Sequence, residues 1–307
     1  MIFDTHAHYD DERFDGDRDA LLSGLFSGGV ETVVNISSDL ASVQKTLDLL
    51  GKYPFLYGTV GIHPTDSGEL DEEKFGWVCD TAKMYRYKAV AGAGGVDDQV
   101  SGDTAARHLS PGSLTQWDEN AGAVGIDRQG MADSPGRIVA IGEIGLDYYW
   151  KEPEREIQKK WFRRQLELAR ECALPVVIHS RDAAQDTLTL LKEAHGEEIG
   201  GVFHCFSYSP EVAAQVLGMG FYLGIGGVVT FANAKKLKEV VAAAPLEKLV
   251  LETDAPYLAP VPYRGKRNSS LYLPYVVEEI ARIRGIPEEE VIQATNRNAK
   301  ELFRIGS

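Results

Sequence analysis

Cysteine is scarce in this chain, which excludes a fold held together by cysteine chemistry. Only Cys79, Cys172 and Cys205 occur among the 307 residues. Three cysteines cannot all pair, and none of them shows the CxxC spacing of a zinc ribbon. Neither a disulfide framework nor a cysteine-held zinc is indicated, and a reducing, cytoplasmic compartment is expected.

Long apolar stretches are also missing. No segment has the roughly 18 consecutive apolar residues that a membrane-spanning helix needs. The first ten residues contain two aspartates and two histidines, unlike the basic and apolar regions of a signal peptide. We therefore expect neither a membrane span nor a signal peptide.

Positive charge is in short supply. There are 32 lysines and arginines against 46 aspartates and glutamates, so the formal net charge is −14. This balance argues against broad, non-specific coating of nucleic acid, because such binding depends on many cationic contacts to phosphates. It leaves room for a local basic patch or for metals that attract phosphate. The hydrophobic share of 44% is that of an ordinary folded protein and excludes general disorder.

Eight short runs of apolar, often β-branched residues alternate with helical patterns. Such runs are typical of parallel strands that are buried on both faces. They lie at residues 2–4, 32–37, 57–63, 138–143, 175–179, 201–205, 221–225 and 249–254. Strand followed by helix, eight times, predicts an α/β fold, a single-domain (β/α)8 TIM barrel over residues 1–307, with a doubly wound open sheet as the alternative.

Residues 88–137 interrupt this alternation. They are rich in Gly, Ala, Asp and Ser and show no sustained period of two or 3.6. Because they connect a helix to the fourth strand, a barrel would place them on the face opposite its active site. We interpret them as a long, structureless and solvated insertion, with an oligomer contact or a substrate rim as the alternatives. They leave the oligomeric state open, and we favour a monomer.

Five of the seven histidines fall at or just after the ends of predicted strands. His6 and His8 are two residues apart, so alternation along a strand puts both imidazoles on one side, where they can bind one cation. Glu143 and Asp254 end two further strands. The other strand-end histidines are His63, His179 and His204, whereas His108 and His195 are interpreted as surface residues.

The carboxyl ends of barrel strands meet at one mouth, so these side chains are expected to converge there. Any one strand-end histidine is commonly structural, but the joint pattern favours a metal site. Four imidazoles and two carboxylates exceed the needs of one four-coordinate ion, which indicates two metals with a bridging carboxylate. The expected metal ligands are His6, His8, Glu143, His179, His204 and Asp254.

Characteristic motifs surround these residues. They are HAH at 6–8, GIHP at 61–64, GEIGLDYY at 142–149, HSR at 179–181, HCFS at 204–207, ETDAPYL at 252–258 and APVPYRGKRN at 259–268. Together they resemble the signature blocks of the TatD family of metal-dependent deoxyribonucleases, within the amidohydrolase superfamily. The resemblance covers nearly the whole chain outside residues 88–137. It departs at Ser269-Ser270, where the family usually has Glu-Pro.

The resemblance implies a TIM barrel with two divalent cations at its mouth. It implies that His6, His8 and Asp254 hold one cation and that His179 and His204 hold the other, with Glu143 between them. It also implies hydrolysis of DNA phosphodiester bonds, as a 3′–5′ exonuclease. The fourth strand offers glutamate and no lysine, which favours the TatD group over relatives with a carbamylated lysine.

Several residues receive roles in this hypothesis. Asp254 is the candidate to orient or deprotonate the attacking water. His63 is assigned to the scissile phosphate, with a structural role as the alternative. Arg181 is expected to clamp phosphate, unless it forms an ion pair with Asp182 or another carboxylate. Glu143 is included with the catalytic residues as the bridging ligand.

A short basic and aromatic stretch follows the last strand. Arg264, Lys266 and Arg267 supply three cations within four residues, and Tyr257 and Tyr263 precede them. Tyrosines can stack unpaired bases, so this rim suits single-stranded DNA ends better than long duplexes. A solvated basic loop is the alternative.

The identity of the metal stays open between Zn, Mn and Mg. Imidazole ligands favour transition metals, whereas magnesium prefers oxygen and the TatD family is often described as magnesium-dependent. Activity is expected to collapse below about pH 6, where imidazoles protonate. Two further hypotheses are a binuclear hydrolase of a small amide, lactone or phosphoester, and a catalytically idle scaffold.

Overall fold

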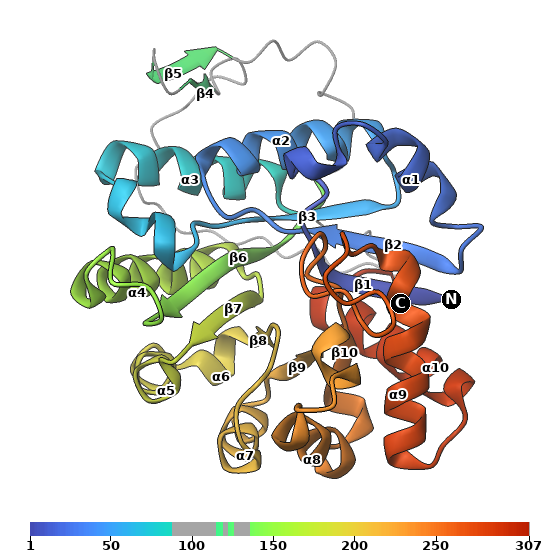
Figure 1. The fold of residues 1–307 in the computed structure, drawn as a ribbon. Helices are drawn as coiled ribbons and strands as arrows, with labels where there is room; N and C mark the ends of the chain where they lie inside the picture. Colours follow the sequence, from blue (N-terminus) through green and yellow to red (C-terminus); the bar gives the residue numbers. More distant parts are fainter. Residues whose placement is uncertain (88–114, 119–121, 126–135, 307) are drawn as a thin grey trace, which may run out of the picture.

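The computed structural model describes residues 1–87, 115–118, 122–125 and 136–306. Eight parallel strands form one sheet that curls into a nearly closed barrel (Figure 1). In spatial order they are β1 (Ile2–Ala7), β2 (Val30–Asn35), β3 (Leu56–Val60), β6 (Ile138–Asp147), β7 (Val176–Arg181), β8 (Gly201–Phe203), β9 (Tyr222–Ile225) and β10 (Leu249–Leu251). Chain order equals spatial order, and a parallel bridge from Ala7 to Ala255 joins the first strand to the segment after the last. The predicted TIM barrel is confirmed, and the doubly wound alternative is wrong because the strand order never reverses.

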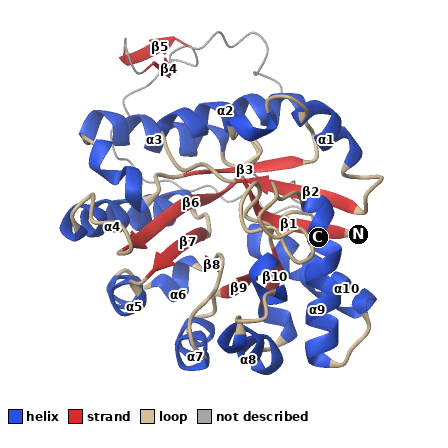
Figure 2. Ribbon diagram, in the orientation of Figure 1, coloured by secondary structure: helices blue, strands red, loops and turns tan. Residues whose placement is uncertain are grey.

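Helices surround the barrel on its outside (Figure 2). They are α1 (Arg18–Gly24), α2 (Leu40–Lys52), α3 (Glu72–Tyr85), α4 (Arg155–Cys172), α5 (Ala184–Glu193), α6 (Gly196–Ile199), α7 (Pro210–Gly218), α8 (Lys235–Ala243), α9 (Leu273–Arg284) and α10 (Glu288–Phe303). Within the described ranges, none of them is both long and apolar enough to cross a bilayer. All three cysteines, Cys79, Cys172 and Cys205, are free.

The end of the barrel where the strands begin is filled by apolar side chains. Residues from the starts of the strands, such as Phe3 and Val177, pack together with Leu302 and Phe303 from the last turn of α10. The rings of Phe3 and Phe303 stack with their centroids 6.2 Å apart. Because this end is closed by hydrophobic packing, the polar side chains of the strands are left to gather at the opposite end.

Four strands end earlier than predicted. β2 stops at Asn35. β3, β8 and β10 stop at Val60, Phe203 and Leu251, and the chain then turns across the mouth. Cys205 and Asp254 have φ angles of 45° and 55°, in the left-handed region that cannot continue a strand. His63, His204 and Asp254 therefore reach the mouth from the segments just after the strands, whereas β6 runs four residues further than expected.

The insertion contains a second, small sheet. β4 (Thr115–Asp118) and β5 (Gly122–Gly125) pair antiparallel, so the expectation of a structureless segment is wrong for these residues. Strands of four residues are too short for the sequence to show a clear period. At its base, Arg86 bridges to Ile138 and the Tyr87 N–H donates to the Ile138 carbonyl at 2.8 Å, beside the start of β6. His108 lies outside the described residues. Most of the insertion does too, so its interpretation as a solvated segment, an oligomer contact or a substrate rim stays a prediction.

Candidate metal centre

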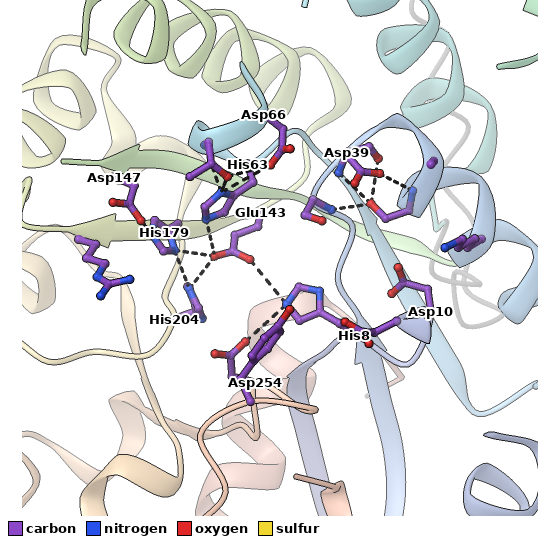
Figure 3. A pocket seen from close by; sticks show the side chains of 18 of the residues that line it. His8, Asp10, Asp39, His63, Asp66, Glu143, Asp147, His179, His204 and Asp254 are labelled. Carbon is purple, nitrogen blue, oxygen red and sulfur yellow. Dashed lines mark hydrogen bonds and ion pairs between the residues drawn. The ribbon is translucent and has the colours of Figure 1, made fainter. Parts of the chain in front are cut away.

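A cavity of about 650 Å³ opens at the carboxyl ends of the strands. Five of the six expected ligands line it, and Figure 3 shows their side chains pointing toward one another. They are His8, Glu143, His179, His204 and Asp254. His6, the sixth, is fully buried beneath them. The barrel thus brings together residues from β1, β6, β7 and the segments after β8 and β10.

Glu143 lies at the centre of this cluster. Its Oε1 is 2.7 Å from His204 Nε2 and 2.8 Å from His179 Nδ1. Its Oε2 is 3.4 Å from His6 Nε2 and 3.8 Å from His8 Nε2. Each carboxylate oxygen therefore faces one pair of imidazoles, which is the arrangement that a carboxylate shared between two ions requires.

Asp254 completes the side of the cluster near β1. Its Oδ1 is 3.5 Å from His8 Nε2 and 3.7 Å from His6 Nε2, and those two nitrogens are 3.1 Å apart. Several sets of three side chains have their possible ligand atoms within 4.8 Å of one another, and two of these sets include Glu143. Those two sets are His6, His8 and Glu143, and Glu143, His179 and His204.

The hydrogen-bond partners of two rings orient their lone pairs into the cluster. His8 Nδ1 is 2.9 Å from the Ile36 carbonyl, which can only accept, so Nδ1 carries the proton and Nε2 is the free donor atom toward a metal. His179 Nε2 is 3.0 Å from the Asp147 carboxylate, so its Nδ1 faces Glu143 unprotonated in a neutral ring. Such outer partners are typical of metal-ligating histidines.

The electrostatics of the cluster favour added positive charge. Burial alone lowers the pKa of His8 and His204, but the Asp254 carboxylate beside His8 and the Glu143 carboxylate beside both raise these pKa values to about 9 and about 10. Burial likewise raises the pKa of Glu143, yet the surrounding imidazoles hold it well below its usual value. The buried carboxylates are thus stabilised by nearby positive charge. A divalent metal bound by the same imidazoles and carboxylates would supply that charge.

His63 also reaches the cluster. Its Nε2 is 3.7 Å from Glu143 Oε1, and its ring centroid is 4.2 Å from that of His179. The Thr65 N–H donates to its Nδ1 at 3.2 Å, so in a neutral ring the proton lies on Nε2. Burial and the neighbouring His179 lower the pKa of His63 to about 3. A neutral His63 therefore presents an N–H donor to the cavity.

Of the expected substrate-binding residues, Arg181 and Tyr257 line the cavity. The Arg181 guanidinium lies 3.7 Å from the centroid of the Tyr149 ring, and within the described part of the chain it forms no ion pair with Asp182. Tyr257 is half-exposed, and the Arg13 guanidinium lies 4.1 Å from its ring centroid.

The basic residues after the last strand are placed differently from expectation. Arg267 is held by the Asp17 carboxylate at 2.7 and 2.6 Å, and Arg264 lies over the Phe231 ring at 4.3 Å. Neither they nor Lys266 are among the described residues that line the cavity. Tyr263 stacks on Tyr272 instead of facing the mouth. An ion pair with a residue 250 positions away cannot be read from local sequence, which explains the difference.

Sequence reasoning missed several residues of the site. Asp147 ends β6 within the GLDYY motif and is fully buried against His179, so its position after a strand was the available signal. Trp150 and Lys45 line the cavity without any such signal. The rim is otherwise strongly acidic, with Asp10, Asp11, Glu12, Asp39 and Asp66.

Glu252 is a further buried carboxylate that was missed. It lies below His204, and its Oε1 accepts a hydrogen bond from the Cys205 N–H. Burial raises the pKa of Glu252 to about 8. A Cβ at Gly224 would come within 2.1 Å of its Oε2, so glycine at that position makes room for the carboxyl group.

The chain is similar to known metal-dependent hydrolases. The family described as TatD related DNase matches residues 3–304. The uncharacterized metal-dependent hydrolase YabD of Bacillus subtilis is 37% identical over 305 residues, covering 99% of this chain and 100% of the relative. The crystal structure of YjjV, a TatD homologue from Escherichia coli K12, superimposes with a TM-score of 0.79 at 27% identity, covering 99% of this chain and 98% of that one. A TatD family hydrolase from Entamoeba histolytica, 22% identical with a TM-score of 0.76 and coverage of 99% and 98%, shares the fold.

Proposed function

This chain belongs to the TatD-related DNase family, and we propose that it hydrolyses DNA phosphodiester bonds with two divalent metal ions, acting from the 3′ end of single strands. The observation that carries the proposal is the position of Glu143, with one carboxylate oxygen toward each of two imidazole pairs. Family membership supports the DNA substrate, and the donor set supports the metals.

The residues fit two cations. In the proposal His6, His8 and Asp254 would hold one, and His179 and His204 would hold the second, with one Glu143 oxygen facing each group. Four imidazoles favour Zn or Mn, and the carboxylates also accept Mg. When bound, such ions lower the pKa of a water, polarise a phosphate oxygen and offset transition-state charge.

Asp254 is the proposed acceptor of the proton from the attacking water. Its side chain reaches the cavity, and Oδ1 faces the Nε2 atoms of both His6 and His8. Burial alone raises the pKa of Asp254, but the hydrogen bond from His8 and the nearby imidazoles lower it below its usual value. The carboxylate is therefore ionised at neutral pH and able to orient the water.

His63 and Arg181 are the proposed phosphate contacts. The Nε2–H of neutral His63 points toward the cluster, where it can donate to a non-bridging oxygen. Arg181 lines the same cavity and offers its guanidinium from the end of β7. Because His63 is neutral, it can donate a hydrogen bond to the phosphate without adding a positive charge beside the proposed cations.

The acidic rim limits how DNA can approach. Carboxylates far outnumber the two cationic side chains, Lys45 and Arg181, that line the cavity. Long duplex binding needs many phosphate contacts, which this mouth does not supply. A single-stranded end that places one phosphate near the cluster fits the cavity better.

The test is a time course with single-stranded DNA labelled separately at its 5′ and 3′ ends. Wild type, His204→Ala and the surface control His195→Asn are compared with Mg²⁺, Mn²⁺ and EDTA. His195 is exposed and lies outside the cavity, in a left-handed turn that asparagine tolerates. A metal-dependent ladder that shortens from the 3′ end, kept by His195→Asn and lost by His204→Ala, is the expected result.

One observation favours a second candidate, a binuclear hydrolase of a small phosphoester, lactone or amide. The basic residues Arg264 and Arg267 are engaged away from the cavity, which leaves few cations for a polyanion. A protein that contains metal but leaves every DNA strand intact in the time course would support this candidate over the nuclease.

A further inference from the structure

We propose that Trp150, with Tyr149 and Arg181, forms a stacking subsite for the unpaired nucleobase next to the scissile phosphate. This inference rests on the proposed function and deepens it, because it names the part of the substrate that is recognised beside the metal centre.

Two large aromatic side chains are exposed next to each other, one in the cavity lining and one beside it. Tyr149 and Trp150 are each 55% exposed, and their ring centroids are 4.9 Å apart with planes at 89°. Trp150 lines the same cavity as Glu143 and His179. Aromatic rings usually bury most of their surface, so exposure of two adjacent rings at a cavity marks a surface for a ligand.

Arg181 gives this surface a cationic edge. Its guanidinium lies 3.7 Å from the centroid of the Tyr149 ring and also lines the cavity. The side chain is exposed and forms no ion pair with another described residue. A guanidinium stacked on an aromatic ring keeps its N–H groups in the plane, free to donate to phosphate oxygens.

A buried carboxylate fixes the aromatic pair to the metal centre. Asp147 Oδ1 accepts a hydrogen bond from the Tyr149 N–H at 2.9 Å, while Oδ2 faces His179 Nε2 at 3.0 Å. The Gln158 side chain accepts from the Asp147 N–H and donates to the Asp147 carbonyl, both at 2.9 Å. These bonds hold the backbone before Tyr149 and Trp150 in place, which positions the start of the platform beside the metal centre.

The chemistry of the surface fits a nucleobase. An indole face offers stacking to any base, and the Arg181 guanidinium that lines the same cavity can contact the adjoining phosphate. Stacking on Trp150 needs a base whose face is free, which a paired base inside a duplex does not offer. The subsite thus supplies a structural reason for a preference for single strands.

The experiment compares wild type with Trp150→Ala, Trp150→Phe and Phe26→Ala. Phe26 is 70% exposed and lies outside the cavity, so its removal controls for loss of a surface aromatic. Each Mn²⁺-loaded protein receives a single strand with normal bases and the same strand with abasic residues at its 3′ end. KM and kcat are measured on both, and Kd is measured with phosphorothioate-linked versions that resist hydrolysis.

We expect Trp150→Ala to raise KM and Kd for the normal strand about 5- to 150-fold, which corresponds to the 1–3 kcal/mol of one stacked base. Its values for the abasic strand should match wild type, and kcat should change little. Trp150→Phe should keep most of the affinity because its ring still stacks, and Phe26→Ala should match wild type on both strands.

Equal KM and Kd for wild type and Trp150→Ala on the normal strand would overturn the subsite. So would an equal loss on both strands, because that marks a structural effect. If wild type binds the normal strand more tightly than the abasic one but cleaves neither, the proposed function fails while the subsite stands. If wild type binds both equally, the subsite fails whatever the cleavage result.

Discussion

Asp147 joins two parts of the site through its two carboxylate oxygens. One faces His179 Nε2 and so directs His179 Nδ1 toward Glu143, and the other accepts the Tyr149 N–H. Its position after a predicted strand is a local signal, but the sequence does not show that the Asp147 side chain is buried against His179. Its role becomes clear only when the barrel brings β6 and β7 together, with Asp147 paired to Arg181 and Gly145 to His179.

Replacing Asp147 by asparagine should weaken metal binding about 10- to 100-fold, the usual cost of losing such an outer partner. An amide no longer favours the His179 tautomer that leaves Nδ1 unprotonated. Competitive titration against a metal-binding dye measures this change. Asp182→Asn, at an exposed neighbouring acid, is the control, and equal affinities in both variants would contradict the assignment.

The imidazoles also predict a pH dependence for protein stripped of metal by a chelator. The pKa values of His8 and His204 are raised from 6.5 to about 9 and about 10, so their protonated forms stabilise the fold. This stabilisation is fully present below about pH 6.5 and is lost as the pH rises through 9 to 10. The free energy of unfolding should therefore fall on the order of a few kcal/mol over this range.

Denaturant unfolding at a series of pH values checks this prediction. Metal-loaded protein serves as the reference, since its ligating imidazoles are already deprotonated and should show no comparable fall. If the metal-free protein instead gained stability between pH 7 and 10, the result would be opposite to the prediction. It would contradict the conclusion that Glu143 and Asp254 raise the pKa values of His8 and His204.

At the scale of elements, the closeness of β6 and β7 positions two of the six candidate ligands, Glu143 and His179. Gly145 has a φ angle of 141°, and a Cβ there would lie 1.9 Å from the His179 carbonyl oxygen. The two strands can approach this closely only because residue 145 has no side chain. The GEIGLDYY motif thus contains both a candidate metal ligand, Glu143, and the glycine that allows β6 to approach β7, Gly145.

Gly145→Ala should separate β6 from β7 and displace His179. We expect a loss of more than about 2 kcal/mol in unfolding free energy, because both the clash and the φ angle disfavour alanine. Bound metal should fall in parallel. Gly76→Ala is the matched control, since nothing lies within 4 Å of its added methyl group in α3, and it should stabilise by about 0.4–1 kcal/mol. A Gly145→Ala protein as stable as wild type would contradict this account of β6 and β7.

The sequence predicted where the barrel strands lie, but it predicted less accurately the residues at which they end. Apolar runs located all eight barrel strands, because strands buried on both faces are nearly continuous hydrophobic segments. The left-handed turns at Cys205 and Asp254 shortened two strands, and non-glycine residues in that region carry no local signal. The convergence of His6, His8, Glu143, His179, His204 and Asp254 was predictable because barrel topology alone brings strand ends together.

At the scale of the whole molecule, the negative charge predicts that the proposed DNA binding depends on metal. The net charge is −14, and the cavity rim is dominated by carboxylates. Chelator-treated protein should therefore bind a single-stranded oligonucleotide at least tenfold more weakly than protein with Mn²⁺, as measured by fluorescence anisotropy. Affinity unchanged by metal removal would mean that another, basic surface binds the DNA.

Contacts between residues far apart in the sequence explain why Arg264 and Arg267 do not line the cavity, although the sequence predicted that they contact substrate. Arg267 lies near Asp17 because the segment after β10 lies beside the segment after β1, where the barrel closes. The sequence placed three cations beside a ligand but could not show that one was already paired and another packed on Phe231. Charge clusters need the folded structure before they can be assigned to a substrate.

The most direct test of the central claim is the number of metal ions bound per chain. Elemental analysis of wild type, Glu143→Gln and the surface control Glu239→Gln, each dialysed against the same Mn²⁺ or Zn²⁺ solution, would measure it. We predict two ions per chain in wild type and in Glu239→Gln, and one or fewer in Glu143→Gln. A wild type that binds a single ion, or a Glu143→Gln protein that keeps both, would contradict a centre built around Glu143.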